Sequence, residues 1–204
     1  MFDESFTKLE INEIAPIIDV INNKIEGSTF DPLETTILAI DVPFYSGYRF
    51  LSISDYATSP PLQRFAFQKN NSDNFIIIDW TYNTIYSINK ESPINLNDEN
   101  ILEYVRFFFS YVKGRHGRFI ICESMSNIEW KDEPIDDVRK KINEILKPLE
   151  IKEKRTDGTY EIKSLMMLKD ALFNVDIFVE PNGNITMSNH EIMIENLPVI
   201  DLSF

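Results

Sequence analysis

A dense apolar pattern marks the stretch 101–112 as a helix that must be covered on several sides. Its polar positions are Glu103, Arg106 and Ser110, followed by Lys113. At about 100° per residue these four positions fall within an arc of roughly 80°, so the rest of the circumference is apolar. Asn97, followed by two acidic residues, predicts the start of this helix. We therefore expect a largely buried central helix.

Helical periodicity also predicts two helices before any strand and one helix further on. Isoleucines recur at helical spacing across 11–25. Residues 31–34 resemble a capping box with proline at the first helical position, which predicts a short second helix to about Ile40. We therefore expect 1–41 to be a helical N-terminal segment. An amphipathic pattern over 133–147 predicts the further helix.

Alternating apolar residues and turn signals predict about eight or nine strands. The expected strands are 48–54, 64–68, 75–80, 84–88, 119–122, 151–155, 160–168, 171–179 and 184–187. Asp157-Gly158 and the turn 181–184 are strong hairpin signals, whereas Lys169-Asp170 fits either a tight turn or a bulge in one bent strand. Together these elements predict an α+β fold in one domain, 1–204. In that fold a mainly antiparallel sheet packs around the central helix.

The C-terminal segment 190–204 is too apolar to be left in water. It is rich in isoleucine and leucine and ends in phenylalanine. We expect it to pack on the body of the protein or on a partner. Together with the nearly all-round apolar helix, this tail favours a protein that acts by association, as a homodimer.

Composition and charge indicate a globular chain and narrow its partners. Of 204 residues, 43% are hydrophobic, which is typical of a packed core. The formal net charge of −13 gives a long-range field that repels nucleic acid and anionic membranes. We therefore expect neither as a partner. The acidic surface serves solubility or attracts a basic partner.

The single cysteine, Cys122, cannot form an internal disulfide, and its apolar neighbours predict a buried structural thiol. This fits a reducing compartment. The first residues are acidic and precede no long apolar run, so we expect neither a secretory signal nor a membrane span. These observations predict a cytoplasmic protein.

A short basic turn follows the central helix. Arg115, His116 and Arg118 gather around Gly114 and Gly117. Gly114 suits the left-handed position after a helix, and cations there complement the negative end of the helix dipole. The alternative is a site for an anion or an acidic partner, because arginines and flexible glycine backbone can approach such a ligand.

No motif for catalysis, a cofactor or a metal centre occurs, and we expect none of the three. The acids within 132–137 fit a helix start, with a hard cation as the alternative. Asp79 follows an apolar strand, so either a raised pKa or a solvated strand end is possible. His190 reads as a surface histidine, and its spacing and that of His116 do not indicate a pair with Cys122.

Two functions of different classes remain. The first is a non-enzymatic cytoplasmic protein whose contact surface is the basic turn or the C-terminal tail. The alternative is an enzyme or small-molecule-binding protein that holds an anionic ligand near the Arg115-His116-Arg118 turn, with Arg106 also in the site. In that alternative Glu103 or Asp79 is a candidate base.

Overall fold

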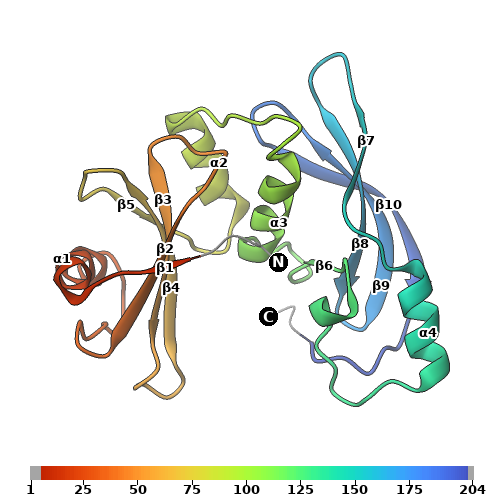
Figure 1. Cartoon of the computed structure of the whole chain (residues 1–204), viewed down its shortest axis with the longest axis horizontal. Helices are drawn as coiled ribbons and strands as arrows, with labels where there is room; N and C mark the ends of the chain where they lie inside the picture. Colours follow the sequence, from red (N-terminus) through yellow and green to blue (C-terminus); the bar gives the residue numbers. More distant parts are fainter. Residues whose placement is uncertain (1–5, 202–204) are drawn as a thin grey trace. The chain divides into compact units, whose positions relative to one another are not determined.

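The computed structural model describes residues 6–201, which form two compact units, 6–79 and 80–201. Each unit contains one five-stranded antiparallel sheet (Figure 1). The mixed helix and sheet class is therefore confirmed. The arrangement differs from the prediction, because the described strands are divided between two sheets and do not form one. The single-domain prediction is untested and stays a prediction.

The first unit is a meander of strands with one helix. In chain order it contains β1 (Thr7–Lys8), α1 (Ile11–Asn22), β2 (Thr35–Asp41), β3 (Tyr48–Asp55), β4 (Leu62–Lys69) and β5 (Phe75–Ile77), and the strands lie side by side in that order. The isoleucines of α1 pack against Ile37 and Ile53 on one face of this sheet (Figure 1). Phe50 and Phe67 face each other across β3 and β4, with ring centroids 5.4 Å apart.

The predicted helix up to Ile40 is wrong, because β2 occupies that stretch. Asp31 caps a turn here, not a helix: its Oδ1 accepts the N–H of Leu33 at 2.9 Å and its carbonyl accepts the N–H of Glu34 at 3.1 Å. The β-branched run that follows pairs with β3 over seven residues. Of the predicted helical segment 1–41, only α1 is therefore helical among the described residues, and 1–5 lie outside them.

The second unit carries the remaining helices and a curved sheet. It contains α2 (Tyr82–Glu91), α3 (Ile101–Tyr111), β6 (Ile120–Ile121), the 3₁₀ turn η1 (Met125–Asn127), α4 (Asp136–Ile145), β7 (Glu150–Lys154), β8 (Tyr160–Leu168), β9 (Ala171–Val179) and β10 (Ile185–Ile194). The strand order is β10-β9-β8-β6, and β7 also pairs with β8. Lys169 and Asp170 form a tight turn, so β8 and β9 are a hairpin.

The predicted strand 84–88 is wrong, because α2 covers it. Ile85, Ile88 and Asn89 are buried at a spacing of three and four residues, which is the inner face of a helix. A short apolar run of this kind fits both the helical and the strand periodicity, and tertiary burial decides between a helix and a strand.

The two faces of β8 are covered by different helices. Leu165 and Met167 pack with Ile142 of α4 on one face. Ile162 and Met166, which alternate with them, are buried on the other face, the side on which Figure 1 draws α3. The bounds of this strand were predicted correctly because turn residues flank it, Asp157-Gly158 before it and Lys169-Asp170 after it.

The central helix is largely buried within this chain, whereas only Leu197 and Val199 are buried in the described part of the C-terminal tail. Six residues of α3 are buried: Ile101, Tyr104, Val105, Phe107, Phe108 and Phe109. In the tail, β10 runs to Ile194, and Leu197 and Val199 join the cluster around Cys122. The tail residues 202–204 lie outside the described part. Among residues 6–201, no helix is both long and apolar enough to cross a lipid bilayer.

Candidate functional site

The exit of α3 differs from the predicted glycine cap. The helix ends at Tyr111, and Val112 is already extended. Gly114 and Gly117 exchange two backbone hydrogen bonds, of 2.9 and 3.2 Å, and this places Arg115 and His116 at the tip of a two-residue turn. The left-handed conformation belongs to Gly117, with φ of 118°, and not to Gly114.

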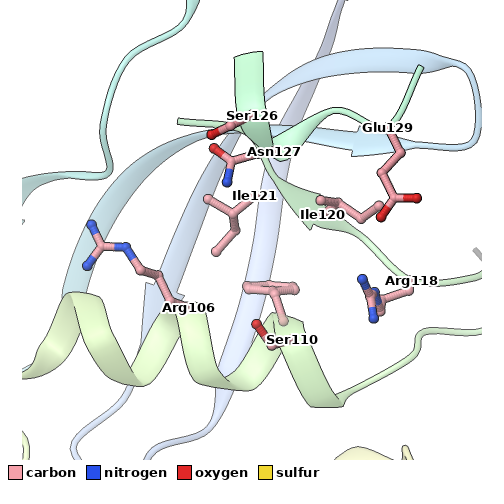
Figure 2. Close-up of a pocket in the computed structure, with 9 residues that line it drawn as sticks. Arg106, Ser110, Arg118, Ile120, Ile121, Ser126, Asn127 and Glu129 are labelled. Atoms are coloured by element: carbon pink, nitrogen blue, oxygen red, sulfur yellow. The ribbon is translucent and has the colours of Figure 1, made fainter. Parts of the chain in front are cut away.

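A small pocket lies between the C-terminal half of α3, β6 and η1 in the second unit (Figure 2). It encloses about 130 Å³ and is lined by Arg106, Phe109, Ser110, Arg118, Ile120, Ile121, Ser126, Asn127 and Glu129. Two of the four candidate residues, Arg106 and Arg118, are therefore brought together. Arg115 and His116 are exposed on the turn and do not line the pocket.

Arg106 forms a wall of the pocket, but its charge is already neutralised. Its Nε and Nη2 donate to the two carboxylate oxygens of Glu123, each at 2.8 Å, and its Nη1 donates to Glu103. These hydrogen bonds to Glu123, reinforced by the charges of both acids, raise the pKa of Arg106 above its ordinary value. We conclude that Arg106 holds the pocket in shape and offers little free charge to a ligand.

Arg118 is the available cation of the pocket. Its Nε is buried and has no hydrogen-bond partner among the described residues. The ion pairs found between described residues do not include Arg118. Its positive charge acts on the neighbouring phenol, where burial raises the pKa of Tyr111 to about 12 and Arg118 opposes that rise. A buried guanidinium N–H without an acceptor is costly, so an oxyanion here would be stabilised.

Polar groups from α3 and η1 complete the lining. The Oδ1 atom of Asn127 accepts the N–H groups of Glu123 and Ser124 at 3.0 and 2.9 Å, so its amide nitrogen is the atom directed at the pocket (Figure 2). Ser110 adds a hydroxyl from the helix, and Glu129 extends from the opposite side toward Arg118 (Figure 2). The pocket thus combines an apolar floor with several donors and one rim carboxylate.

Part of this lining could have been found in the sequence. Ser110 follows Arg106 by four residues and therefore shares its helix face. Asn127 and Glu129 come from a short irregular segment, and only the tertiary fold brings them opposite α3. No periodic signal marks such a segment.

The other candidate residues lie elsewhere. Asp79 is exposed in the first unit and lies two residues beyond β5, which ends at Ile77, so the predicted strand 75–80 is too long. Cys122 is fully buried, and burial raises the pKa of its thiol to about 12, as expected for a structural cysteine. His190 is exposed on β10. Asp136 and Asp137 occupy the first turn of α4, where acids stabilise a helix.

Within residues 6–201, no group of three or more histidine, cysteine, aspartate or glutamate side chains is placed to hold a metal ion. The chain matches no protein-family model, and comparisons with curated proteins and with solved structures find no match either.

Proposed function

We propose that this protein binds a small molecule with a carboxylate group, and that Arg118 is its principal contact. The observation that carries the proposal is the buried Nε of Arg118, which has no acceptor among the described residues and lies in the wall of a pocket. Leaving a buried donor unsatisfied costs about 1–3 kcal/mol, and more for a charged group. A carboxylate oxygen in the pocket would remove that cost.

The size and lining of the pocket limit the ligand. Its volume of about 130 Å³ is close to the roughly 150 Å³ of a cavity that accepts benzene. Phe109, Ile120 and Ile121 supply apolar surface, while Asn127 and Ser110 supply polar contacts beside Arg118. This combination favours a short aliphatic or aromatic acid over a nucleotide or a sugar phosphate.

The proposal is restricted to binding because the pocket offers no base held near a reacting atom. Glu103, the candidate base in this unit, hydrogen-bonds to Arg106 and does not line the pocket. Glu129 lines it but is exposed at the rim. General base catalysis requires a carboxylate within hydrogen-bonding reach of the proton that it removes.

Two arginines of the same turn provide a matched test. Propionate and benzoate are titrated against the protein and followed by amide shifts in NMR spectra, and native mass spectrometry reports any ligand retained from expression. Arg118→Gln should weaken binding by about tenfold or more, because it removes the buried donor. Arg115→Gln removes the same charge from the exposed tip, so it should change affinity by less than about twofold. Equal effects of the two variants would show only diffuse electrostatic attraction and would refute the proposal.

Substitution of Glu129 tests whether the ligand also carries a positive charge. A simple carboxylate is repelled by this rim acid, so Glu129→Gln should strengthen binding by a few-fold, or about 1 kcal/mol at most. If the substitution weakens binding instead, the ligand must carry a cation that Glu129 contacts, as a zwitterionic amino acid does.

Association as a homodimer in the cytoplasm stays a prediction. Of its supports in the sequence, the apolar helix α3 is buried within the chain, and Leu197 and Val199 of the tail pack into a core cluster of the second unit. The apolar helix therefore does not require a second copy, whereas Ile192 and Ile200 of the tail are exposed. The oligomeric state can be read from the same native mass spectra.

A further inference from the structure

A second pocket lies on the other side of the chain segment that carries Arg118. It encloses about 150 Å³ and is lined by Tyr82, Tyr86, Phe108, Phe109, Val112, Lys113, Gly114, Phe119, Ile185 and Met187. Arg118 and Ile120 line the first pocket, whereas Phe119 between them lines the second. Side chains of an extended segment alternate in direction, so this segment, together with Phe109, which lines both pockets, forms the wall between two sites.

The second pocket is apolar and aromatic, and it suits one bulky apolar side chain. Tyr86 stacks on Phe108 with ring centroids 5.9 Å apart, which forms one side. Tyr82 lies next to Tyr86, with ring centroids 5.5 Å apart, and 52% of its surface is exposed. Aromatic residues that are partly exposed around a preformed pocket are typical of anchor sites in protein interfaces.

An open sheet edge borders this pocket. Among the strands of residues 6–201, β10 pairs with β9 alone. The backbone N–H of Glu180 donates to the carbonyl of Asn184 across this pair, so the backbone groups of Asn184 face β9. Those of the next residue, Ile185, therefore face outward. The hydroxyl of Tyr86 occupies that outward position, accepting the N–H of Ile185 at 3.0 Å and approaching its carbonyl at 3.4 Å.

Because backbone N–H and carbonyl groups point outward at every second residue of an edge strand, those of Met187 also face outward. Its side chain lines the pocket, and no hydrogen bond from the described residues reaches its outward N–H or carbonyl. The position therefore offers one donor and one acceptor, in strand geometry, beside an apolar pocket. Only an extended polypeptide supplies the complementary pair together with a side chain.

The charges at this pocket have the sign opposite to that of the whole protein. Lys113 lines it, with its ammonium 4.9 Å from the ring centre of Trp80. Arg115 and His116 follow on the exposed turn, and His190 of β10 lies against Phe119. No ion pair between described residues involves Lys113 or Arg115. Because the chain carries a net charge of −13, the positive charges of these two residues favour an acidic partner here.

We propose that this surface is a docking site for an extended acidic segment of another protein. One bulky apolar residue of the segment fills the pocket, its backbone pairs with Met187, and its carboxylates contact Lys113 and Arg115. The site is separate from the Arg118 pocket and does not depend on a ligand there.

The test begins with a displayed library of random peptides of about twelve residues, selected on the intact chain. The expected consensus is one bulky apolar residue flanked by aspartate or glutamate. The consensus peptide, labelled with fluorescein, is then measured by fluorescence anisotropy. A selection that yields no such consensus overturns the proposal.

Variants then assign the contacts. Lys113→Glu should weaken the consensus peptide by about tenfold or more, and Lys140→Glu, an exposed charge reversal on α4, by less than about twofold. Met187→Pro removes an N–H that the β9 ladder does not use, so it should abolish binding and leave the circular dichroism spectrum intact. Tyr82→Ala tests the anchor independently, in case the proline variant does not fold. Peptide affinity that is unchanged in Lys113→Glu and Tyr82→Ala overturns the proposal.

Arg118→Gln separates the two sites. It should leave peptide affinity within about twofold while removing carboxylate binding. Failure of the carboxylate titration with normal peptide binding would refute the proposed function alone.

Discussion

Arg106 and Glu123 form a two-point ion pair in which both N–O distances are 2.8 Å. The pair joins α3 to the segment that follows β6. Glu123 also accepts the N–H of Leu149 at 2.9 Å, immediately before β7. Both side chains are largely buried, with 14% and 18% of their surface exposed. Three segments that are distant in sequence thus meet at one charge pair.

Breaking this pair should be strongly destabilising. Arg106→Met leaves the carboxylates of Glu123 and Glu103 without their counter-charge, and the loss of one partner of a buried pair costs about 3–5 kcal/mol. Arg139→Met is the matched control, since the Arg139–Glu133 pair is exposed and spans 3.7 Å. Its removal should cost less than about 1 kcal/mol. Urea denaturation followed by tryptophan fluorescence measures both, and similar costs would show that burial of the first pair does not matter.

Acid should destabilise the protein through Glu161. Hydrogen bonds from Lys152 and Arg155 lower the pKa of this carboxyl below its ordinary value. A group whose pKa is lowered by folding stabilises the protein above its unfolded pKa, about 4.3 for glutamate. That contribution is lost as the pH falls through the lower, folded value. Glu161→Gln should therefore flatten the fall in stability below about pH 4.5, measured by urea denaturation across pH. An unchanged slope would show that Glu161 titrates normally.

Gly183 should not tolerate a side chain. A Cβ atom there would lie 2.5 Å from Nδ2 of Asn89 and 2.9 Å from the hydroxyl of Tyr104, with φ at +80°. That hydroxyl donates to the carbonyl of Gly183 at 2.6 Å, so the methyl group would also disturb a buried hydrogen bond. Gly183→Ala should cost about 2–3 kcal/mol.

Gly27 supplies the control for this substitution. It has nearly the same φ, at +86°, but no atom lies within 4 Å of an added Cβ. Gly27→Ala should therefore cost only about 1 kcal/mol of backbone strain. Thermal unfolding of the unit that carries each substitution measures the two losses of stability. Equal losses would show that backbone strain, and not the contacts around Gly183, accounts for the effect.

The single-domain prediction can be tested by comparing two probes of unfolding. Both tryptophans, Trp80 and Trp130, belong to the second unit, so their fluorescence reports that unit alone. Far-ultraviolet circular dichroism reports both units, because each contains a sheet and at least one helix. One cooperative domain requires coincident urea transitions from the two probes. Separate midpoints would refute the prediction.

The elements predicted best are those whose apolar pattern admits one period. In α3 the polar residues are confined to a narrow arc, and this leaves no strand alternative. The strands 160–168 and 171–179 were predicted with the bounds of β8 and β9, because turn residues separate and flank them.

The two wrong elements show where local signals fail. Asp31-Pro32 carries the signature of a helix start, yet the same side-chain hydrogen bond closes a turn before β2. The run 84–88 fits both periods, and tertiary burial selects the helix. Similarly, Arg118 could be singled out as a cation directly after Gly117, but the pocket around it depends on η1, which no pattern predicts.

The alternation at Arg118, Phe119 and Ile120 makes the length of the preceding turn more critical than its composition. Insertion or deletion of one residue between Gly114 and Gly117 would rotate the following side chains by half a turn. The guanidinium would then enter the aromatic pocket, and the phenyl ring would enter the polar one. In natural variants of this chain, the number of residues between the two glycines should therefore stay fixed.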